Sequence, residues 1–78
     1  MAGNKPLTWC GNVPTRCNLC GTPIRPDMSF TDGRLAKSGA WMILCTGCHA
    51  RHGVGLGVGN GQRYGYDAKS KEWIKLEG

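Results

Sequence analysis

The chain has 78 residues, among them 13 glycines and five cysteines, and it carries a net charge of +5. A chain of this length forms one domain with a thin core, because it buries only about 60% of the surface that it exposes when unfolded. It contains no run of about 18 apolar residues, which excludes a membrane-spanning helix. It also has no apolar signal segment at its start, which predicts a cytoplasmic protein with reduced cysteines.

Residues 1–15 contain turn formers and a lone Trp9-Cys10 pair, without helical or strand periodicity, and they predict an irregular arm. Residues 16–53 follow as the predicted zinc finger, which begins with Cys17-Asn-Leu-Cys20-Gly21. This segment predicts a tight metal-binding turn, a zinc knuckle. Gly21 is expected to adopt the positive φ angle that turns backbone amides toward sulfur.

Two short strands are expected within the finger, over Met28–Thr31 and Trp41–Leu44. The Asp32-Gly33 pair between them is a turn signal, and the connecting loop carries the basic residues Arg34 and Lys37. The sequence therefore predicts a β-hairpin with a basic loop.

A short helix is expected directly after the second strand. Thr46 is its predicted N-cap, the helix continues to His52, and Gly53 ends it. Its length is then about two turns.

Glycine alternates with other residues from Gly53 to Gly61. The spacing lacks the G-x-G-x-x-G fingerprint of dinucleotide binding and the Lys-Ser/Thr of a phosphate-binding loop, so cofactor binding is not predicted. We expect an extended segment whose Val54, Leu56 and Val58 face the core, while its glycines allow another layer to approach closely.

Residues 54–78 are predicted to pack on the finger within a single domain and to end in a β-hairpin. Its strands are expected over Gln62–Tyr66 and Glu72–Leu76, with Asp67–Lys71 as the turn. An amphipathic helix over Ala68–Leu76 is the alternative. The predicted fold class is a small, metal-stabilised α+β fold.

Two Cys-x-x-Cys pairs, separated by 24 residues, give the chain its chemistry. Each pair places two thiolates on one turn, and two such turns complete a tetrahedron around a zinc ion. Two local disulfides would close short strained loops, and redox catalysis would need only one pair. Four thiolates leave no open position for an activated water, so the predicted zinc is structural. The predicted ligands are Cys17, Cys20, Cys45 and Cys48.

The remaining cysteine and the two histidines are not expected to bind the zinc. Cys10 is predicted to be a spare thiol, small and buried or idle, because the two pairs suffice. His49 directly follows Cys48 and is expected to point away from the metal. His49 and His52 are therefore predicted to be solvated or to face a partner.

The excess of positive charge lies in the first part of the chain. Residues 1–63 hold seven Lys or Arg against two Asp, whereas residues 64–78 hold three charges of each sign. One zinc with four thiolates adds a charge of −2, which leaves the finger modestly basic. We expect a nucleic acid as partner. The predicted phosphate contacts are Arg34, Lys37 and Arg51, with stacking on Trp41 or Tyr64.

A host protein is the alternative partner. Trp9, Tyr66 and Trp73 would then be exposed aromatic anchors. For Trp41 and Trp73, a place in the small core is favoured over either contact role.

The order of a knuckle, a hairpin and a cysteine pair that opens a helix resembles treble-clef zinc fingers over residues 17–53. Within it, Leu44–Arg51 resembles the closing segment of zinc-containing HNH endonucleases, in which a His after the last Cys serves the catalytic metal. This resemblance implies a metal-binding role for His49. HNH enzymes carry a further His on the strand before the helix, and here no His precedes position 49. A degenerate nuclease without its general base is therefore the enzyme alternative.

The chain as a whole also resembles small zinc-finger proteins of bacteriophages. These similarly end in a glycine-alternating stretch followed by Gly-Gln-x-Tyr, here Gly61-Gln-Arg-Tyr64. The resemblance implies an accessory protein in the cytoplasm of a host cell. The predicted function is a non-catalytic, structural-zinc module that binds nucleic acid.

Overall fold

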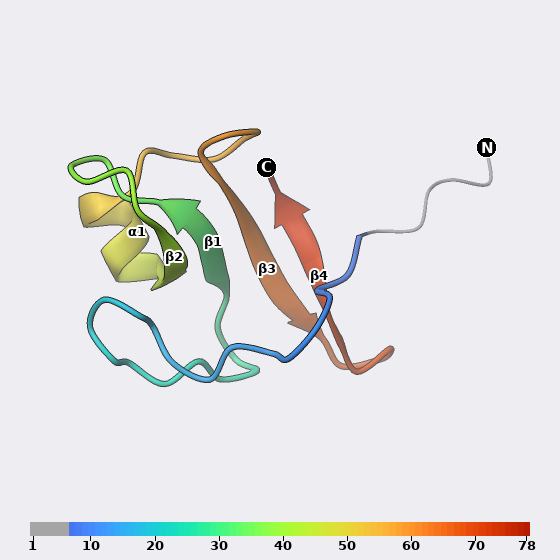
Figure 1. Cartoon of the computed structure of the whole chain (residues 1–78). Helices are drawn as coiled ribbons and strands as arrows, with labels where there is room; N and C mark the ends of the chain where they lie inside the picture. Colours follow the sequence, from blue (N-terminus) through green and yellow to red (C-terminus); the bar gives the residue numbers. More distant parts are fainter. Residues whose placement is uncertain (1–6) are drawn as a thin grey trace.

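The structure, a computed structural model, describes residues 7–78, so residues 1–6 of the predicted arm lie outside the described residues. Its strands form one antiparallel sheet in the order β2-β1-β3-β4, and the helix lies beside β2 (Figure 1). This is a small α+β fold; the treble-clef arrangement itself stays a prediction. The elements are β1 (Phe30–Arg34), β2 (Trp41–Cys45), α1 (Thr46–His52), β3 (Gly61–Asp67) and β4 (Glu72–Glu77).

β1 lies inside the sheet and includes the residues predicted to turn. Asp32 and Gly33 pair with β2 on one side and with β3 on the other. The predicted turn at these residues is therefore wrong, because sheet pairing on both sides outweighs the local preference. The chain turns within residues 36–38, where the Gly39 N–H donates to the Leu35 carbonyl at 2.9 Å. Arg34 is thus the last residue of a strand and not part of a loop.

β3 and β4 form the predicted C-terminal hairpin, and the alternative helix over Ala68–Leu76 is wrong. Asp67 closes its turn: the carbonyl accepts the Lys71 N–H at 2.7 Å, and the carboxylate accepts the Ser70 hydroxyl at 2.8 Å. The Ser70 hydroxyl also holds the pKa of Asp67 below its ordinary value. Because β1 pairs with β3, the two hairpins share one sheet. The domain boundaries after residues 15 and 53 stay predictions.

The described end of the N-terminal arm forms a short extra edge of the sheet. The Trp9 N–H donates to the Trp73 carbonyl at 2.8 Å, and the Lys75 N–H donates to the Leu7 carbonyl at 2.7 Å. Figure 1 shows this segment beside β4. The pairing is an isolated bridge between Thr8 and Ile74 and not a strand, so the irregular arm over residues 1–15 stays a prediction. Three residues are too few for periodicity to reveal a bridge of this kind.

Three aromatic rings pack against Phe30, which is fully buried, and a fourth, that of Tyr66, packs against Trp73. The Phe30 ring stacks on Tyr64 with centroids 5.4 Å apart and lies 5.1 Å from the Trp73 ring. Phe30 and Tyr64 are register partners on β1 and β3, so their side chains share one face of the sheet. We call this group the aromatic cluster; its members are Trp9, Phe30, Tyr64, Tyr66 and Trp73.

The aromatic cluster decides between the contact and core roles predicted for the tryptophans. Trp73 is 7% exposed, which confirms its place in the core and contradicts its role as an exposed anchor. Trp9 and Tyr66 are half-buried in the same cluster. Trp41 is 46% exposed, so its predicted core place is wrong. Its indole N–H donates to the Asp32 carboxylate at 2.6 Å.

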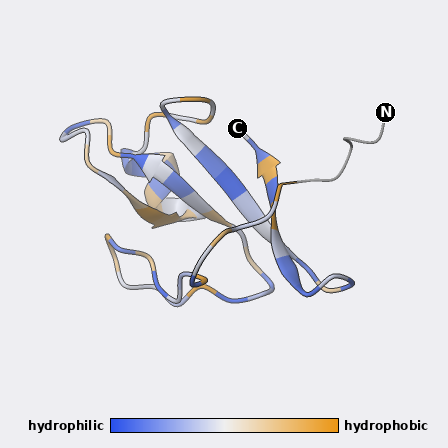
Figure 2. Ribbon diagram, turned by 45° about the vertical axis from the view of Figure 1, so that its right-hand side comes forward, coloured by the Kyte–Doolittle hydropathy of each residue, from blue (hydrophilic) through white to orange (hydrophobic). Residues whose placement is uncertain are grey.

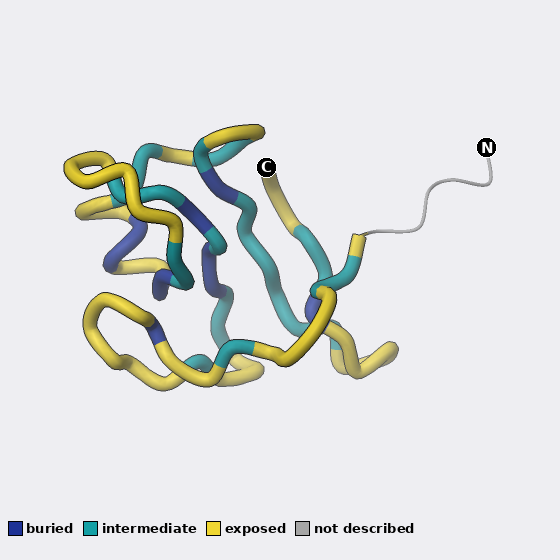
Figure 3. Tube along the Cα trace, in the orientation of Figure 1, coloured by how far each residue is buried: buried dark blue, intermediate teal, exposed yellow. Residues whose placement is uncertain are grey.

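A second buried group surrounds Leu44, which is fully buried and packs with Cys17, Cys45 and Cys48. Figure 3 shows buried residues on β1 and around the start of α1, whereas β3 is mostly half-buried and β4 is partly exposed. Much of β3 is hydrophilic (Figure 2), and the bulky apolar surface that it contributes comes from the rings of its two tyrosines. The fold therefore rests on two small apolar groups, in agreement with the thin core expected from its length.

The glycine-alternating segment is not extended, because it folds back as a tight turn. The Gly61 N–H donates to the Gly57 carbonyl at 2.9 Å, and the Gly57 N–H donates back to Gly61 at 2.8 Å. Val58, predicted to face the core, is 95% exposed at the tip of this turn. The φ angles of Gly55, Gly57 and Gly59 are +103°, +122° and +82°. Such angles reverse the chain, so the alternation serves backbone shape more than strand packing.

Close approach, the other predicted use of the glycines, is confirmed where the segment meets the sheet. A Cβ on Gly61 would lie 3.2 Å from both the Gly33 Cα and the Gly55 carbonyl oxygen. Contacts of this length are tighter than most Cβ atoms show, so a larger residue at this crossing would require the neighbouring backbone to move by a few tenths of an ångström.

Candidate metal centre

The first half of the centre is the knuckle over residues 17–22. The Cys17 N–H donates to the Thr22 carbonyl at 2.8 Å, and the Gly21 N–H donates to the Cys17 carbonyl at 2.9 Å. Gly21 has a φ of +79°, which confirms the predicted positive angle. The Cys20 N–H points at the Cys17 sulfur at 3.5 Å. The turn thus brings both sulfurs of the first pair to one side.

Asn18 attaches the knuckle to the outer edge of β2. Its N–H donates to the Ile43 carbonyl at 2.8 Å, and its side-chain oxygen accepts the Ile43 N–H at 2.9 Å. These two hydrogen bonds pair the backbone N–H and carbonyl of Ile43, on the outer edge of β2, as a neighbouring strand would. They also place the knuckle two residues away from Cys45, the last residue of β2.

The second half of the centre is the junction of β2 and α1. Cys45 occupies the N-cap position of α1, and Cys48 lies in its first turn and is buried. The prediction that Thr46 caps the helix is wrong: Thr46 is the first helical residue, and its hydroxyl lies 3.2 Å from the Ser29 hydroxyl. Gly53 ends the helix as predicted, with its N–H donating to the His49 carbonyl at 2.9 Å.

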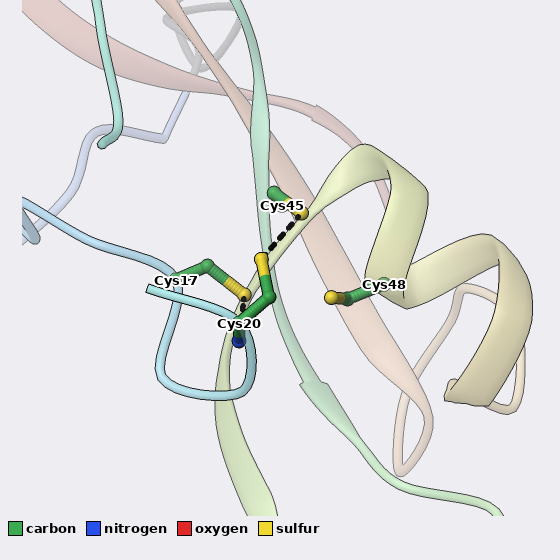
Figure 4. Close-up of side chains that lie close together, drawn as sticks. All are labelled: Cys17, Cys20, Cys45 and Cys48. Carbon is green, nitrogen blue, oxygen red and sulfur yellow. Dashed lines mark hydrogen bonds between the residues drawn. The ribbon is translucent and has the colours of Figure 1, made fainter. Parts of the chain in front are cut away.

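The two halves bring four sulfur atoms together, which we call the cysteine cluster (Figure 4). All four sulfurs lie within 4.8 Å of one another, and those of Cys20 and Cys45 are 3.7 Å apart. A zinc tetrahedron with bonds of about 2.3 Å has sulfur separations of about 3.8 Å. The arrangement therefore fits a single tetrahedral ion between the knuckle and the helix. The members are Cys17, Cys20, Cys45 and Cys48.

The electrostatics of the cysteine cluster favour a bound cation. The Thr22 hydroxyl, 2.9 Å from the Cys20 sulfur, lowers the pKa of Cys20 to about 6. Burial opposes ionisation of Cys17, but backbone N–H groups outweigh it and lower the pKa of that thiol. Burial, together with the neighbouring sulfurs, raises the pKa of Cys48 far above its ordinary value. A divalent cation would relieve the repulsion among the sulfurs and stabilise all four as thiolates.

Cys10 lies apart from the cysteine cluster. It is exposed, so the expected buried thiol is wrong, and its sulfur lies 3.9 Å from the Thr8 carbonyl oxygen. The alternative expectation of an idle thiol stays a prediction.

His49 is 6% exposed, and the expectation of a solvated or partner-facing side chain is therefore wrong. Its Nε2 lies 2.8 Å from the Gly55 carbonyl oxygen, which only accepts hydrogen bonds, so the imidazole donates from Nε2. This bond ties α1 to the glycine-alternating segment. The sequence did not reveal it, because it depends on the positive φ of Gly55.

Gly53 has space only for a hydrogen atom beside the His49 ring, and this predicts the effect of Gly53→Ala. A Cβ at Gly53 would come within 2.4 Å of His49 Cδ2 and 2.8 Å of the His49 carbonyl oxygen. The φ of Gly53 is −82°, which alanine tolerates, so the clash alone decides. We expect a loss of about 1–3 kcal/mol in the free energy of unfolding, measured by denaturant titration.

Gly47→Ala is the matched control. A Cβ at Gly47 meets nothing within 4 Å, and Gly47 lies inside α1. Alanine there should raise stability by about 0.5–1 kcal/mol. Equal effects of the two substitutions would show that His49 is not packed against Gly53.

The three predicted phosphate contacts are placed differently by the structure. Lys37 and Arg51 line one surface groove together with His52, and all three side chains are exposed. Arg34 instead donates to the Gly59 carbonyl at 3.0 Å and to the Asn60 side-chain oxygen at 3.2 Å. Its guanidinium thus holds the glycine-rich turn.

Comparison with protein-family models, curated proteins and solved structures finds no match to this chain. The phage and HNH resemblances therefore stay without support from known proteins. In the described part of the chain no helix is long and apolar enough to cross a membrane.

Proposed function

We propose that this chain is a structural zinc module in which one Zn²⁺ joins the knuckle to the start of α1. A single observation carries the proposal: four sulfur atoms, from two segments far apart in the sequence, lie within 4.8 Å of one another. Sulfur-only donor sets in a tetrahedral arrangement suit zinc, which is held by four thiolates in many small domains.

Zinc would supply most of the stability. Binding to such a site contributes on the order of 10–16 kcal/mol at neutral pH, against a net stability of about 5–15 kcal/mol for a typical domain. The largest fully buried side chains in the described chain are only those of Phe30, Leu44 and Thr31. An ion that links distant segments compensates for so small a core.

The module is proposed to be non-catalytic. Four thiolates complete a tetrahedral sphere and leave no position for a reactive water. His49, the residue that the HNH resemblance would assign to a catalytic metal, uses its Nε2 to bind the Gly55 carbonyl. Metal-dependent DNA cleavage that disappears in His49→Ala, with zinc retained, would contradict this part of the proposal.

Nucleic acid is the proposed partner. The chain carries a net charge of +5, and Lys37 and Arg51 share one groove. A host protein is the alternative, which the burial of Trp73 makes less attractive because one expected anchor is lost. An accessory role in a bacteriophage rests only on the resemblance of the chain as a whole, with its glycine-alternating stretch and Gly61-Gln-Arg-Tyr64, to small phage zinc-finger proteins.

Native mass spectrometry of the purified protein tests the zinc proposal. We expect the mass of the chain plus one zinc ion, and loss of that ion with a strong chelator should abolish the near-ultraviolet circular dichroism of the aromatic cluster. A chain that carries no metal, yet keeps this signal after chelator treatment, would rule out a structural zinc.

A further inference from the structure

A groove of about 550 Å³ opens between the knuckle, the loop after β1 and the end of α1. Its volume falls within the range of about 300–1,000 Å³ that is usual for ligand sites. Its apolar lining, which we call its floor, comes from Leu19, Leu35 and Ala36, and its basic and imidazole groups are Lys37, Arg51 and His52. We call it the basic groove.

The elements that line the basic groove are tied to one another. The Ala36 N–H donates to the His52 carbonyl at 2.8 Å, which fastens the loop to the end of α1. Leu35 forms an isolated bridge with Gly53 and a backbone bond with Ala40 at 2.8 Å. Leu19 lies between Cys17 and Cys20 in the knuckle. Zinc bound by the cysteine cluster would therefore fix one wall of the groove against the other.

The charge of the basic groove selects an anionic ligand. Among residues 7–78 the ion pairs are Arg25 with Asp27 and Arg63 with Glu77, so Lys37 and Arg51 are not neutralised by any described carboxylate. Two free cations beside an apolar floor suit a ligand that presents anionic groups next to a flat apolar one. A nucleotide combines a phosphate with such a surface, its base.

The apolar part of the basic groove's lining favours single-stranded over duplex nucleic acid. A base can reach an apolar floor only when it is unstacked and turned out, as in loops and single strands. Leu19 is 42% exposed and lies at the surface where such a base would enter. The His52 ring offers an additional planar group for stacking.

We propose that the basic groove binds single-stranded nucleic acid, with a base against Leu19 and Leu35 and flanking phosphates on Lys37 and Arg51. This inference rests on the proposed function, because zinc would hold the walls of the groove together.

Fluorescence anisotropy tests the proposal with labelled oligothymidine, oligouridine and a DNA duplex of equal length, at several salt concentrations. We expect both single strands to bind the zinc-loaded protein more tightly than the duplex does. Arg51→Ala and Lys37→Ala should each weaken binding about fivefold, and each should reduce the slope of log affinity against log salt by about 0.7. Lys69→Ala, which removes one exposed charge in the β3–β4 turn, is the matched control and should change affinity less than twofold.

Leu19→Ser separates base contact from charge. It should weaken binding several-fold and leave the salt slope unchanged, because no phosphate contact is lost. Zinc content and unfolding of each variant are measured in parallel, so a failure of the zinc proposal appears there and not in the binding data. Equal losses for Lys69→Ala and Lys37→Ala, equal binding of duplex, or no oligonucleotide binding at low salt would overturn the proposal. So would binding of a glutamate-rich peptide in place of the oligonucleotides.

Discussion

Cys48→Ser is expected to abolish cooperative unfolding of the protein. The Cys48 sulfur comes from the first turn of α1 and is buried, and the other three sulfurs surround it within 4.8 Å. A serine hydroxyl is a poor zinc ligand, so three thiolates would remain close together around a weakly held ion. Zinc binding contributes roughly 10–16 kcal/mol, and a large part of it would be lost. That loss is greater than the net free energy of unfolding of a domain of this size. Circular dichroism during a thermal scan, with zinc content measured beside it, checks this result.

Cys10→Ser is the control for this substitution. Cys10 is exposed and lies outside the cysteine cluster, so its replacement should keep one zinc per chain and shift the midpoint of unfolding by no more than a few degrees. Wild-type protein treated with a chelator should behave like Cys48→Ser, and restored zinc should return the transition only in the wild type. A zinc-free Cys48→Ser variant with an unchanged transition would contradict a structural role of the cluster.

The cysteine cluster could be anticipated from the sequence because its geometry is mostly local. Cys17 and Cys20 are three residues apart on one turn, and so are Cys45 and Cys48. Each pair therefore carries its own geometry, and only the meeting of the two pairs needs the fold. That meeting depends on Asn18, which binds both polar groups of the Ile43 backbone. Nothing in the spacing of cysteines indicates this attachment.

Features that depend on distant segments were harder to predict. Asp32-Gly33 has the composition of a turn, yet β3 arrives from about 30 residues further along the chain and pairs with it. Trp41 and Trp73 were both expected in the core, but Trp41 lies on the outer strand β2 and is 46% exposed, whereas the Trp73 ring lies 5.1 Å from the Phe30 ring and is buried. The neighbours that the fold brings to each ring decide which tryptophan is buried.

Phe30→Ala is expected to cause a large loss of stability while the zinc stays bound. Phe30 is fully buried. The centroid of its ring lies 5.1–5.4 Å from the ring centroids of Trp9, Tyr64 and Trp73. Its removal leaves a cavity in the centre of the aromatic cluster, at a cost of about 3–5 kcal/mol. Denaturant titration in excess zinc, followed by tryptophan fluorescence, measures the loss.

Val58→Ala is the control for the same measurement, because Val58 is 95% exposed at the tip of the glycine-rich turn and should contribute less than about 0.5 kcal/mol. Native mass spectrometry should show one zinc in both variants, since the cysteine cluster packs around Leu44 and not around Phe30. A Phe30→Ala variant that loses less than about 1 kcal/mol would show that the aromatic cluster contributes little to stability. Loss of zinc from Phe30→Ala at neutral pH without denaturant would instead show that the two apolar groups are not independent. The pairing of β1 with β2 would then have transmitted the effect of the substitution to the metal centre.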